Sequence, residues 1–280
     1  MFDFDKIRPK SEFTYWFERN DTSSEFSVIY DGRVCDTISY ETTDDAEAIS
    51  EEIISDWFEY MKRPEYSLGK HIPETFLDKA PIDAARQSVL KLGLEKKIVA
   101  CCLSIYPEEN AIKYAARALK WLETTDFYTA PASSIYHDSD YAGLLRHTLK
   151  VVNRLLELSQ LTPFKSVNLA EAVLAAICHD WCKINFYELY QKNQRNPETH
   201  LWEKVDAYKC KGSEYPFGHG VTSMFMAEKL FKLSVEQALA IRWHMSIYDV
   251  SDNQKHDLFD ANEKYPMVML LQMADQLAIL

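Results

Sequence analysis

The sequence predicts a mainly α-helical protein that carries a small α+β unit at its N-terminal end. Only seven of the 280 residues are glycine, and glycine-poor chains have few left-handed turns. From about residue 82 onward, apolar residues recur at the three- and four-residue spacing of a buried helix face. A chain of this length that is 47% hydrophobic can bury a large core, so its length favours one large domain or one domain that carries a smaller appendage.

The appendage is predicted over residues 1–66. Residues 13–40 are rich in aromatic and β-branched side chains, and Asp31-Gly32 separates two runs of alternating apolar and polar residues, which is a strong hairpin signal. In residues 42–63, a threonine that can cap a helix precedes a cluster of acids and apolar residues at helical spacing. This unit is therefore expected to contain two or three antiparallel strands and a helix.

The rest of the chain is predicted to be helical after a connecting segment. Prolines and a glycine mark residues 64–82 as that segment. Helical spacing then predicts helices over residues 82–105, 108–124, 141–159, 168–184, 219–232, 235–246 and 266–279. We assign residues 67–126 to the connecting segment and to helices that pack on a C-terminal domain, residues 127–280. Residues 185–216 are polar and loop-rich, and would form either part of a substrate lid or an ordinary surface excursion.

Charge and apolar content limit the classes of partner. The formal net charge is −12, and residues 1–60 hold sixteen of the 43 acidic residues but only five of the 31 basic ones. The sequence thus lacks the basic pattern of proteins that bind long nucleic acid, whereas small anions remain possible if a metal supplies positive charge. No apolar run reaches the length of a membrane span and the N-terminus lacks a signal-peptide layout, so we expect a cytoplasmic protein with no membrane partner.

The six cysteines show no disulfide framework, and a chain of this length does not need one. Reduced thiols are therefore expected. Cys178 and Cys182 lie four residues apart around His179, which is a weak zinc signal. We interpret both as buried thiols that pack as small hydrophobic side chains.

Histidine and aspartate residues form the most informative pattern in the chain. In order they are His147, His179, Asp180, His219, His244 and Asp275. They lie on five separate predicted helices, each with an apolar stripe that faces the interior. Buried ionisable groups are unfavourable by several kcal/mol unless they are paired or bound to metal. Because imidazole and carboxylate suit transition metals and a carboxylate can bridge two ions, the pattern predicts two divalent ions, which could be Mn, Fe, Ni, Co or Zn.

Small residues near these positions predict close approach of the helices. Three of the seven glycines, Gly143, Gly218 and Gly220, lie near His147 and His219. Glycine is favoured where the backbone must turn or pass close to a ligand. Alanines also precede the His-Asp pair and the final aspartate, so their helices can pack closely there.

These segments resemble the HD-domain superfamily of metal-dependent phosphohydrolases, in particular its six-ligand, dinuclear members. The resemblance covers roughly residues 127–280 and implies an HD-domain helical bundle. The stretch FYTAPASSIYHDSDYAGLLRHT, followed by CHDWCK, is similar to the corresponding part of HD-domain 3′-to-5′ exoribonucleases and of HD proteins from phages and prophages. Those exoribonucleases join the HD domain to a nucleic-acid-binding barrel, whereas the N-terminal unit here is shorter and acidic, which weakens an exonuclease interpretation.

The resemblance also implies roles for the six residues. One metal ion would be bound by His147, His179, Asp180 and Asp275. The other would be bound by His219 and His244, with Asp180 bridging both ions. A water or hydroxide between the ions would act as the nucleophile, because two cations lower its pKa toward neutrality.

Four further residues are candidates for contact with substrate. Lys183 lies on the same predicted helix face as Asp180 and matches a family lysine, so it is a catalytic and phosphate-binding candidate. Alternatively, its positive charge only interacts with the negative C-terminal end of the helix dipole. His137 matches a family histidine near the substrate, or is a solvent-exposed loop residue. Arg146 and Arg242 neighbour ligands in sequence but point about 100° away on a helix, so they are weaker anion-binding candidates. His71, His200 and His256 stand alone and receive no role.

The expected activity is hydrolysis of a phosphate ester or phosphodiester in a small phosphorylated substrate, such as a nucleotide or short oligonucleotide. Two alternatives remain. The first is an HD-type diiron oxygenase, which uses the same six ligands for oxygen chemistry. The second is a non-catalytic domain that binds a nucleotide or a protein, with the acidic residues 1–66 as its docking surface.

Overall fold

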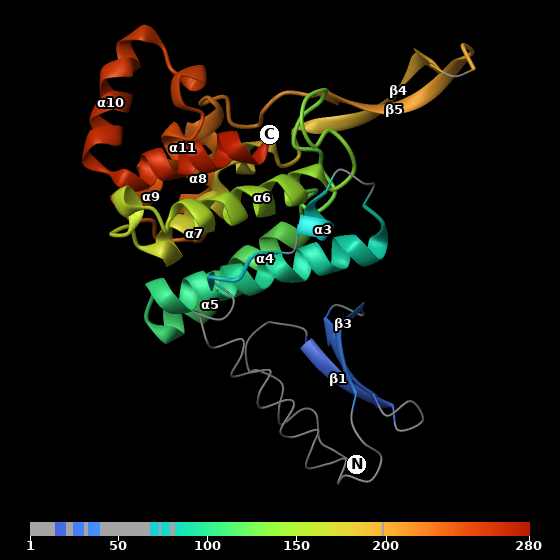
Figure 1. Cartoon of the computed structure of the whole chain (residues 1–280), viewed down its shortest axis with the longest axis horizontal. Coiled ribbons are helices and arrows are strands. Elements are labelled where there is room, and N and C mark those ends of the chain that lie inside the picture. Colours follow the sequence, from blue (N-terminus) through green and yellow to red (C-terminus); the bar gives the residue numbers. More distant parts are fainter. Residues whose placement is uncertain are drawn as a thin grey trace.

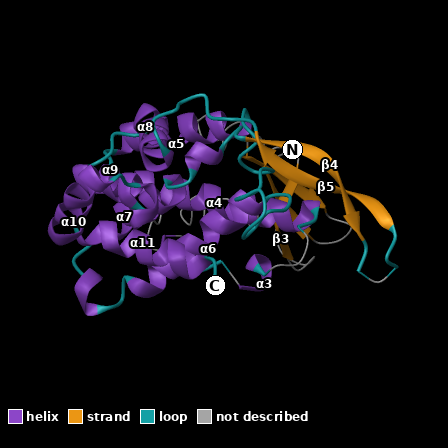
Figure 2. Cartoon of the chain, turned by 90° about the horizontal axis from the view of Figure 1, so that it is seen from above, coloured by secondary structure: helices purple, strands orange, loops and turns teal. Residues whose placement is uncertain are grey.

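A computed structural model describes residues 15–20, 25–30, 33–39, 68–72, 74–78, 82–197 and 199–280. The protein is mainly α-helical, as predicted (Figures 1 and 2). The helices are α3 (Glu74–Leu77), α4 (Ala84–Ile105), α5 (Glu108–Glu123), α6 (Gly143–Leu158), α7 (Leu169–Cys178), α8 (His219–Leu230), α9 (Val235–Trp243), α10 (Lys255–Lys264) and α11 (Pro266–Ala278). Short 3₁₀ turns are η2 (Thr162–Phe164), η3 (Trp181–Lys183), η4 (Ser246–Asp249) and η5 (Asp252–Gln254). Within the described residues, no helix is long and apolar enough to cross a lipid bilayer.

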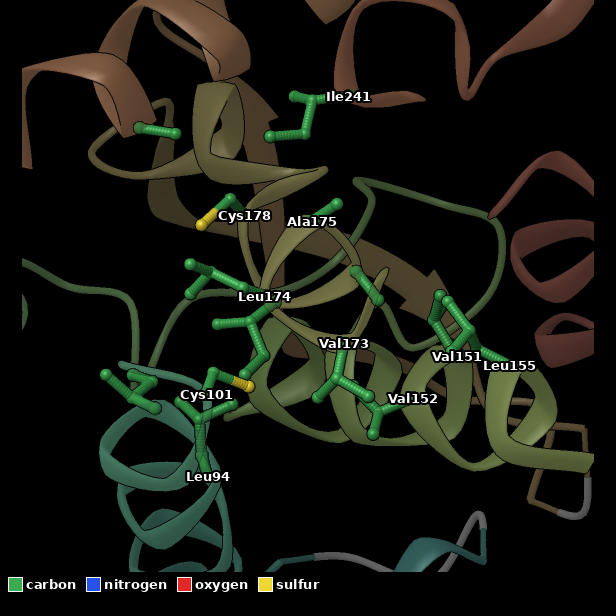
Figure 3. Packing of buried hydrophobic residues seen from close by; sticks show 14 of the residues in the cluster. Leu94, Cys101, Val151, Val152, Leu155, Val173, Leu174, Ala175, Cys178 and Ile241 are labelled. Carbon is green, nitrogen blue, oxygen red and sulfur yellow. The ribbon is translucent and has the colours of Figure 1, made fainter. Parts of the chain in front are cut away.

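The core forms around α7, which is almost entirely apolar and packs against α4, α6 and α9. Figure 3 shows this packing, in which Val173 and Leu174 of α7 meet side chains of α4 and α6. Asn168 begins the helix, because its side chain accepts hydrogen bonds from the backbone N–H groups of Ala170 and Glu171. A helix that is apolar on all sides must be buried, and α7 is therefore the central helix against which the others pack.

Local signals in the sequence set where several helices begin. Asp83 caps α4, and Ser234 forms a capping box with Gln237 at the start of α9. Pro266 occupies the first turn of α11, where its missing N–H costs nothing. These starts lie within two residues of the predicted ones.

One helix ends well before its predicted boundary, and one helix was not predicted. The helix predicted over residues 168–184 ends at Cys178, and the remainder becomes the turn η3. Since the apolar pattern continues through Trp181, which is fully buried, spacing alone does not reveal this break. The helix α10 was not predicted, because its polar composition hides its helical period.

The prediction that residues 185–216 are loop-rich is wrong. They form a hairpin of β4 (Tyr187–Arg195) and β5 (Trp202–Cys210), which projects away from the helices (Figure 1). Nearly every residue of β4 is exposed. Because neither face of the hairpin is buried, its strands do not need alternating apolar and polar residues. The alternation that usually predicts a strand is therefore missing from the sequence.

The N-terminal strands are β1 (Tyr15–Asn20), β2 (Glu25–Tyr30) and β3 (Arg33–Ser39). They form an antiparallel sheet in the order β1-β2-β3, with Tyr30 opposite Arg33. The pairing confirms the hairpin predicted around Asp31-Gly32. The helix predicted within residues 42–63 lies outside the described residues.

Candidate metal centre

The ends of α7, α8 and α9 and the faces of α6 and α11 bring the six predicted residues together. His147 lies on α6 and Asp275 on α11. His179 and Asp180 directly follow α7, His219 begins α8, and His244 directly follows α9. All but His219 and Asp275 are almost completely buried, and these two side chains are 26% and 16% exposed. The cluster is therefore reached from the side of His219 and Asp275.

Close backbone contacts allow these elements to converge. A Cβ atom on Gly220 would lie 2.0 Å from the backbone oxygen of Arg242, so the first turn of α8 rests directly on the last turn of α9. Likewise, a Cβ atom on Gly143 would lie 1.9 Å from the backbone oxygen of Asp138. At these two glycines a side chain would collide with a neighbouring backbone, so glycine is required there for close packing, as predicted. Gly218 has a different role, because it precedes α8 with a positive φ of 93°.

Backbone carbonyl groups orient two of the histidine rings. Nδ1 of His179 lies 2.7 Å from the oxygen of Ala176, and Nδ1 of His244 lies 2.7 Å from the oxygen of Ile241. Because a carbonyl only accepts, each Nδ1 carries a proton and donates it. In the neutral ring, Nε2 is then an unprotonated acceptor directed into the cluster, which is the arrangement typical of metal-binding histidines.

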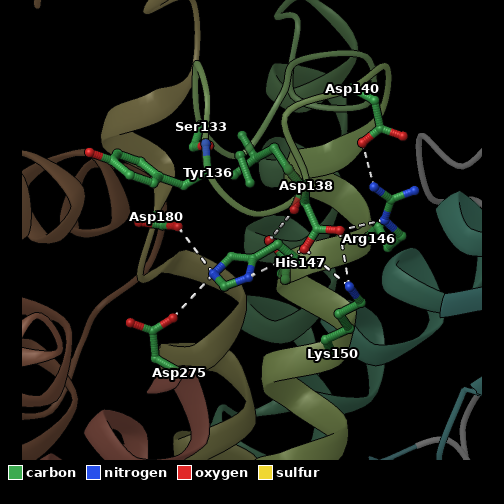
Figure 4. Close-up of polar contacts among 12 residues, drawn as sticks. Ser133, Tyr136, Asp138, Asp140, Arg146, His147, Lys150, Asp180 and Asp275 are labelled. Carbon is green, nitrogen blue, oxygen red and sulfur yellow. Dashed lines mark hydrogen bonds and ion pairs between the residues drawn. The ribbon is translucent and has the colours of Figure 1, made fainter. Parts of the chain in front are cut away.

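Four donor atoms form a compact first group: Nε2 of His147, Nε2 of His179, Oδ2 of Asp180 and Oδ1 of Asp275. The distances measured between pairs of them lie between 3.1 and 3.6 Å. Ligands about 2.1 Å from a tetrahedral zinc ion would be separated by about 3.4 Å. The spacing and the donor types therefore fit one transition-metal ion. Figure 4 shows His147 directed between Asp180 and Asp275.

A second group forms on the other oxygen of Asp180. Oδ1 lies 2.7 Å from Nε2 of His219 and 3.6 Å from Nε2 of His244. Nε2 of His244 is buried and has no hydrogen-bond partner. Asp180 therefore directs its two oxygens toward two different sets of nitrogen donors, as a bridging carboxylate does. Buried histidine and aspartate groups in this protein could hold metal ions.

Opposing effects set the pKa values of these groups in the metal-free protein. Burial opposes the charge on His179, but Asp180 and Asp275 outweigh it and raise its pKa to about 10. Burial likewise opposes the charge on His219, but Cys182 and Asp180 raise its pKa to about 10. Burial would raise the pKa of Asp180, yet Lys183 and His179 hold it well below its usual range. In the metal-free protein, the protons on His179 and His219 thus balance the negative charge of the buried aspartates. Metal cations could replace these protons and balance the same charge.

We expect metal binding to be strongly pH dependent. Raising the pKa of His179 and His219 from 6.5 to about 10 stabilises the metal-free fold below pH 6.5, and this stabilisation is lost as pH rises toward 10. Metal must displace the same protons, so its affinity increases over that window. The rise in melting temperature caused by added Zn²⁺ should be larger at about pH 8 than at about pH 6.

An exposed histidine supplies the control for this measurement. His256 is 83% exposed and lies on α10, away from the cluster, so His256→Gln should keep the same pH dependence. Equal stabilisation by Zn²⁺ at both pH values in the unaltered protein would contradict the assignment of protons to His179 and His219.

The predicted substrate residues lie at different distances from the cluster. Nζ of Lys183 lies 2.6 Å from Oδ2 of Asp180, and the Lys183 side chain is 13% exposed. The ring of His137 is half-buried, with its centroid 4.9 Å from that of His147. Burial, with the nearby His147 and Lys183, lowers the pKa of His137 to about 4, so its ring is neutral at neutral pH. Both residues adjoin the donor atoms.

The two arginines are already occupied by carboxylates. Arg146 is buried and pairs with Asp138, at 2.6 Å, and with Asp140. Arg242 pairs with Asp249 at 3.1 Å and stacks over the ring of Trp243. The structure therefore does not bring either guanidinium into the donor groups, and anion binding by them remains a prediction.

Sequence reasoning assigned no role at the cluster to two residues that lie beside it, and it interpreted one of them, Cys182, as a core thiol. Asp138 is buried, and its Oδ2 lies 3.9 Å from Nδ1 of His147, behind the ring (Figure 4). It could have been noticed because it follows His137 in the quoted motif. Cys178 is buried in the core as predicted (Figure 3), but Cys182 is only half-buried and lies beside Asp180 and His219.

The architecture is a helical fold in which a cluster of histidine and aspartate residues could bind metal, an arrangement compatible with an HD domain. Comparison of the chain with protein-family models, with curated proteins and with solved structures finds no match.

Proposed function

We propose that this protein is a metal-dependent phosphohydrolase of the HD-domain type, which cleaves a phosphate ester or phosphodiester in a small, nucleotide-like substrate. The observation that carries the proposal is the orientation of Asp180, whose two oxygens face two separate sets of histidine donors. Two divalent ions placed there would polarise a phosphoryl oxygen and lower the pKa of a bound water toward neutrality. The resemblance of the motifs in residues 127–280, and of their order, to the HD-domain superfamily supports the same proposal.

Separate side chains would bind the metal ions and contact the substrate. His147, His179, Asp180 and Asp275 would hold one ion, and His219, His244 and Asp180 would hold the other. Lys183 provides a cation beside Asp180, suited to a phosphate oxygen. His137, being neutral, would contact the substrate by hydrogen bonding rather than by charge.

Substitution of Lys183 separates substrate contact from metal binding. Because Lys183 is not a metal donor, Lys183→Ala should keep the metal content and lower kcat/KM by about 100-fold. Elemental analysis and steady-state kinetics on the best substrate check this. Lys192→Ala, in the exposed strand β4, is the matched control and should behave like wild type. If the Lys183 variant loses metal together with activity, the lysine acts by holding Asp180 and not by contacting phosphate.

The function itself is tested by screening phosphomonoesters, cyclic and linear phosphodiesters and nucleotides with metal-loaded protein under anaerobic conditions. Phosphate or nucleoside release without oxygen supports the hydrolase. Turnover that requires oxygen and iron would indicate the oxygenase alternative instead. Metal-loaded protein that binds nucleotides and leaves the whole panel intact would indicate a binding domain.

A further inference from the structure

Cys182 occupies a position beside the second donor group that the six-residue pattern does not include. Its sulfur and one donor atom each from Asp180 and His219 all lie within 4.8 Å of one another. The backbone N–H of Cys182 donates a hydrogen bond, 3.1 Å long, to Oγ of the buried Ser223. Since Ser223 lies one turn after His219 on α8, this bond fixes Cys182 against the helix that His219 begins.

A separate observation indicates that a cation belongs at this place. Nε2 of His244 is buried, has no hydrogen-bond partner, and lies 3.6 Å from Oδ1 of Asp180. Its ring cannot turn to satisfy Nε2 without losing the bond from Nδ1 to Ile241. Buried polar atoms are nearly always satisfied, so an unpartnered nitrogen directed at a carboxylate oxygen points to a missing ligand.

The other cysteines with described side chains do not share this environment. Cys101, Cys102 and Cys178 are fully buried, and Cys178 packs among apolar side chains of the core (Figure 3). Cys210 is exposed at the end of β5. Of these five, Cys182 alone belongs to a group of potential metal donors.

We propose that the thiolate of Cys182 is an additional ligand of the second metal ion, alongside Oδ1 of Asp180, His219 and His244. The inference rests on the metal site of the proposed function and extends it to the identity of the metal. On binding, the thiol loses its proton to solvent and sulfur donates an electron pair to the ion. A sulfur donor favours Zn²⁺, Co²⁺ or Fe²⁺ over Mg²⁺ and Mn²⁺, so the second position is selective for a softer ion than carboxylate and imidazole alone would choose.

The test uses Co²⁺ as a spectroscopic probe of sulfur ligation in the metal-free 280-residue chain. Wild type should develop a near-ultraviolet sulfur-to-cobalt charge-transfer band that saturates with Co²⁺, and Cys210→Ser should behave identically. Cys182→Ser should lose this band while keeping the visible bands of bound Co²⁺. Its affinity for Zn²⁺ should fall by about tenfold or more, because even the loss of a residue that only orients a metal ligand has an effect of that size.

A measurement on the unaltered protein covers the case in which the variant does not fold. Zn²⁺ should slow alkylation of Cys182 by iodoacetamide about tenfold or more, but leave alkylation of Cys210 unchanged, as read by peptide mass spectrometry. A charge-transfer band that persists in Cys182→Ser, or a wild type that binds Co²⁺ without the band, overturns the proposal. So does alkylation of Cys182 that is insensitive to saturating Zn²⁺.

These outcomes are distinguishable from failure of the proposed function. Phosphoester hydrolysis with two bound ions but no sulfur band would overturn ligation by Cys182 and leave the hydrolase intact. A sulfur band that depends on Cys182, in protein that cleaves no phosphoester, would support the ligand and contradict the hydrolase.

Discussion

Replacement of Asp180 by alanine is expected to reduce the metal content from about two ions per chain to less than one and to lower phosphoester hydrolysis by about 1000-fold or more. Both donor groups include this side chain. Oδ2 lies 3.4 Å from Nε2 of His147 and of His179, and Oδ1 lies 2.7 Å from Nε2 of His219. Its loss therefore removes a ligand from each group at once.

The same substitution also removes the partner of a nearly buried cation. Nζ of Lys183 lies 2.6 Å from Oδ2 of Asp180. Removing one member of a buried pair costs about 3–5 kcal/mol of stability, because the remaining charge is left without compensation. The melting temperature of metal-free Asp180→Ala should thus fall below that of the metal-free wild type. Asp180→Asn, which keeps the volume, would show whether the charge itself is required for metal binding.

An exposed carboxylate provides the control for Asp180. The side chain of Asp252 is 92% exposed in η5, outside the donor groups, so Asp252→Ala should match wild type in metal content, activity and melting temperature. Elemental analysis, a phosphate-release assay and thermal unfolding are the measurements. Full activity of Asp180→Ala would remove the basis for assigning catalysis to this cluster.

The inward orientation of these residues could be anticipated because it depends on short-range patterns. His147, His244 and Asp275 each interrupt an apolar stripe, and helical spacing alone predicts that they face the interior. Which residues meet was implied by the resemblance of the ordered motifs to the HD-domain superfamily, and spacing did not show it. Helix starts were also predictable where a capping side chain or a proline fixes them, as Ser234 and Pro266 do.

Features that depend on tertiary context could not be read in the same way. No glycine or proline marks the end of α7 at Cys178, where the chain passes into the turn η3. Asp138 lies behind His147 through a loop whose path no periodicity encodes. Cys182 looked like a core thiol because it was assumed to continue a helix, whereas the change to η3 places it beside His219.

Gly220→Ala is expected to lower the free energy of unfolding by about 3 kcal/mol and to reduce occupancy of the second metal position. The new Cβ atom would lie 2.0 Å from the backbone oxygen of Arg242, and a backbone atom cannot move aside as the end of a side chain can. The first turn of α8 must then separate from the last turn of α9. Because His219 begins α8 and His244 directly follows α9, the separation acts on two donors of one metal ion.

Gly93→Ala is the matched control, since it places the same methyl group in another helix. There the new Cβ atom would lie 2.6 Å from Cδ1 of Ile72, the far end of a flexible side chain that can rotate away. Alanine also has a helix propensity about 1 kcal/mol better than glycine, which offsets that adjustment. Chemical denaturation and Co²⁺ titration should therefore find Gly93→Ala close to wild type and Gly220→Ala impaired in both. If Gly220→Ala were as stable as Gly93→Ala and bound the same amount of Co²⁺, the close contact between α8 and α9 would not be what positions His219 and His244.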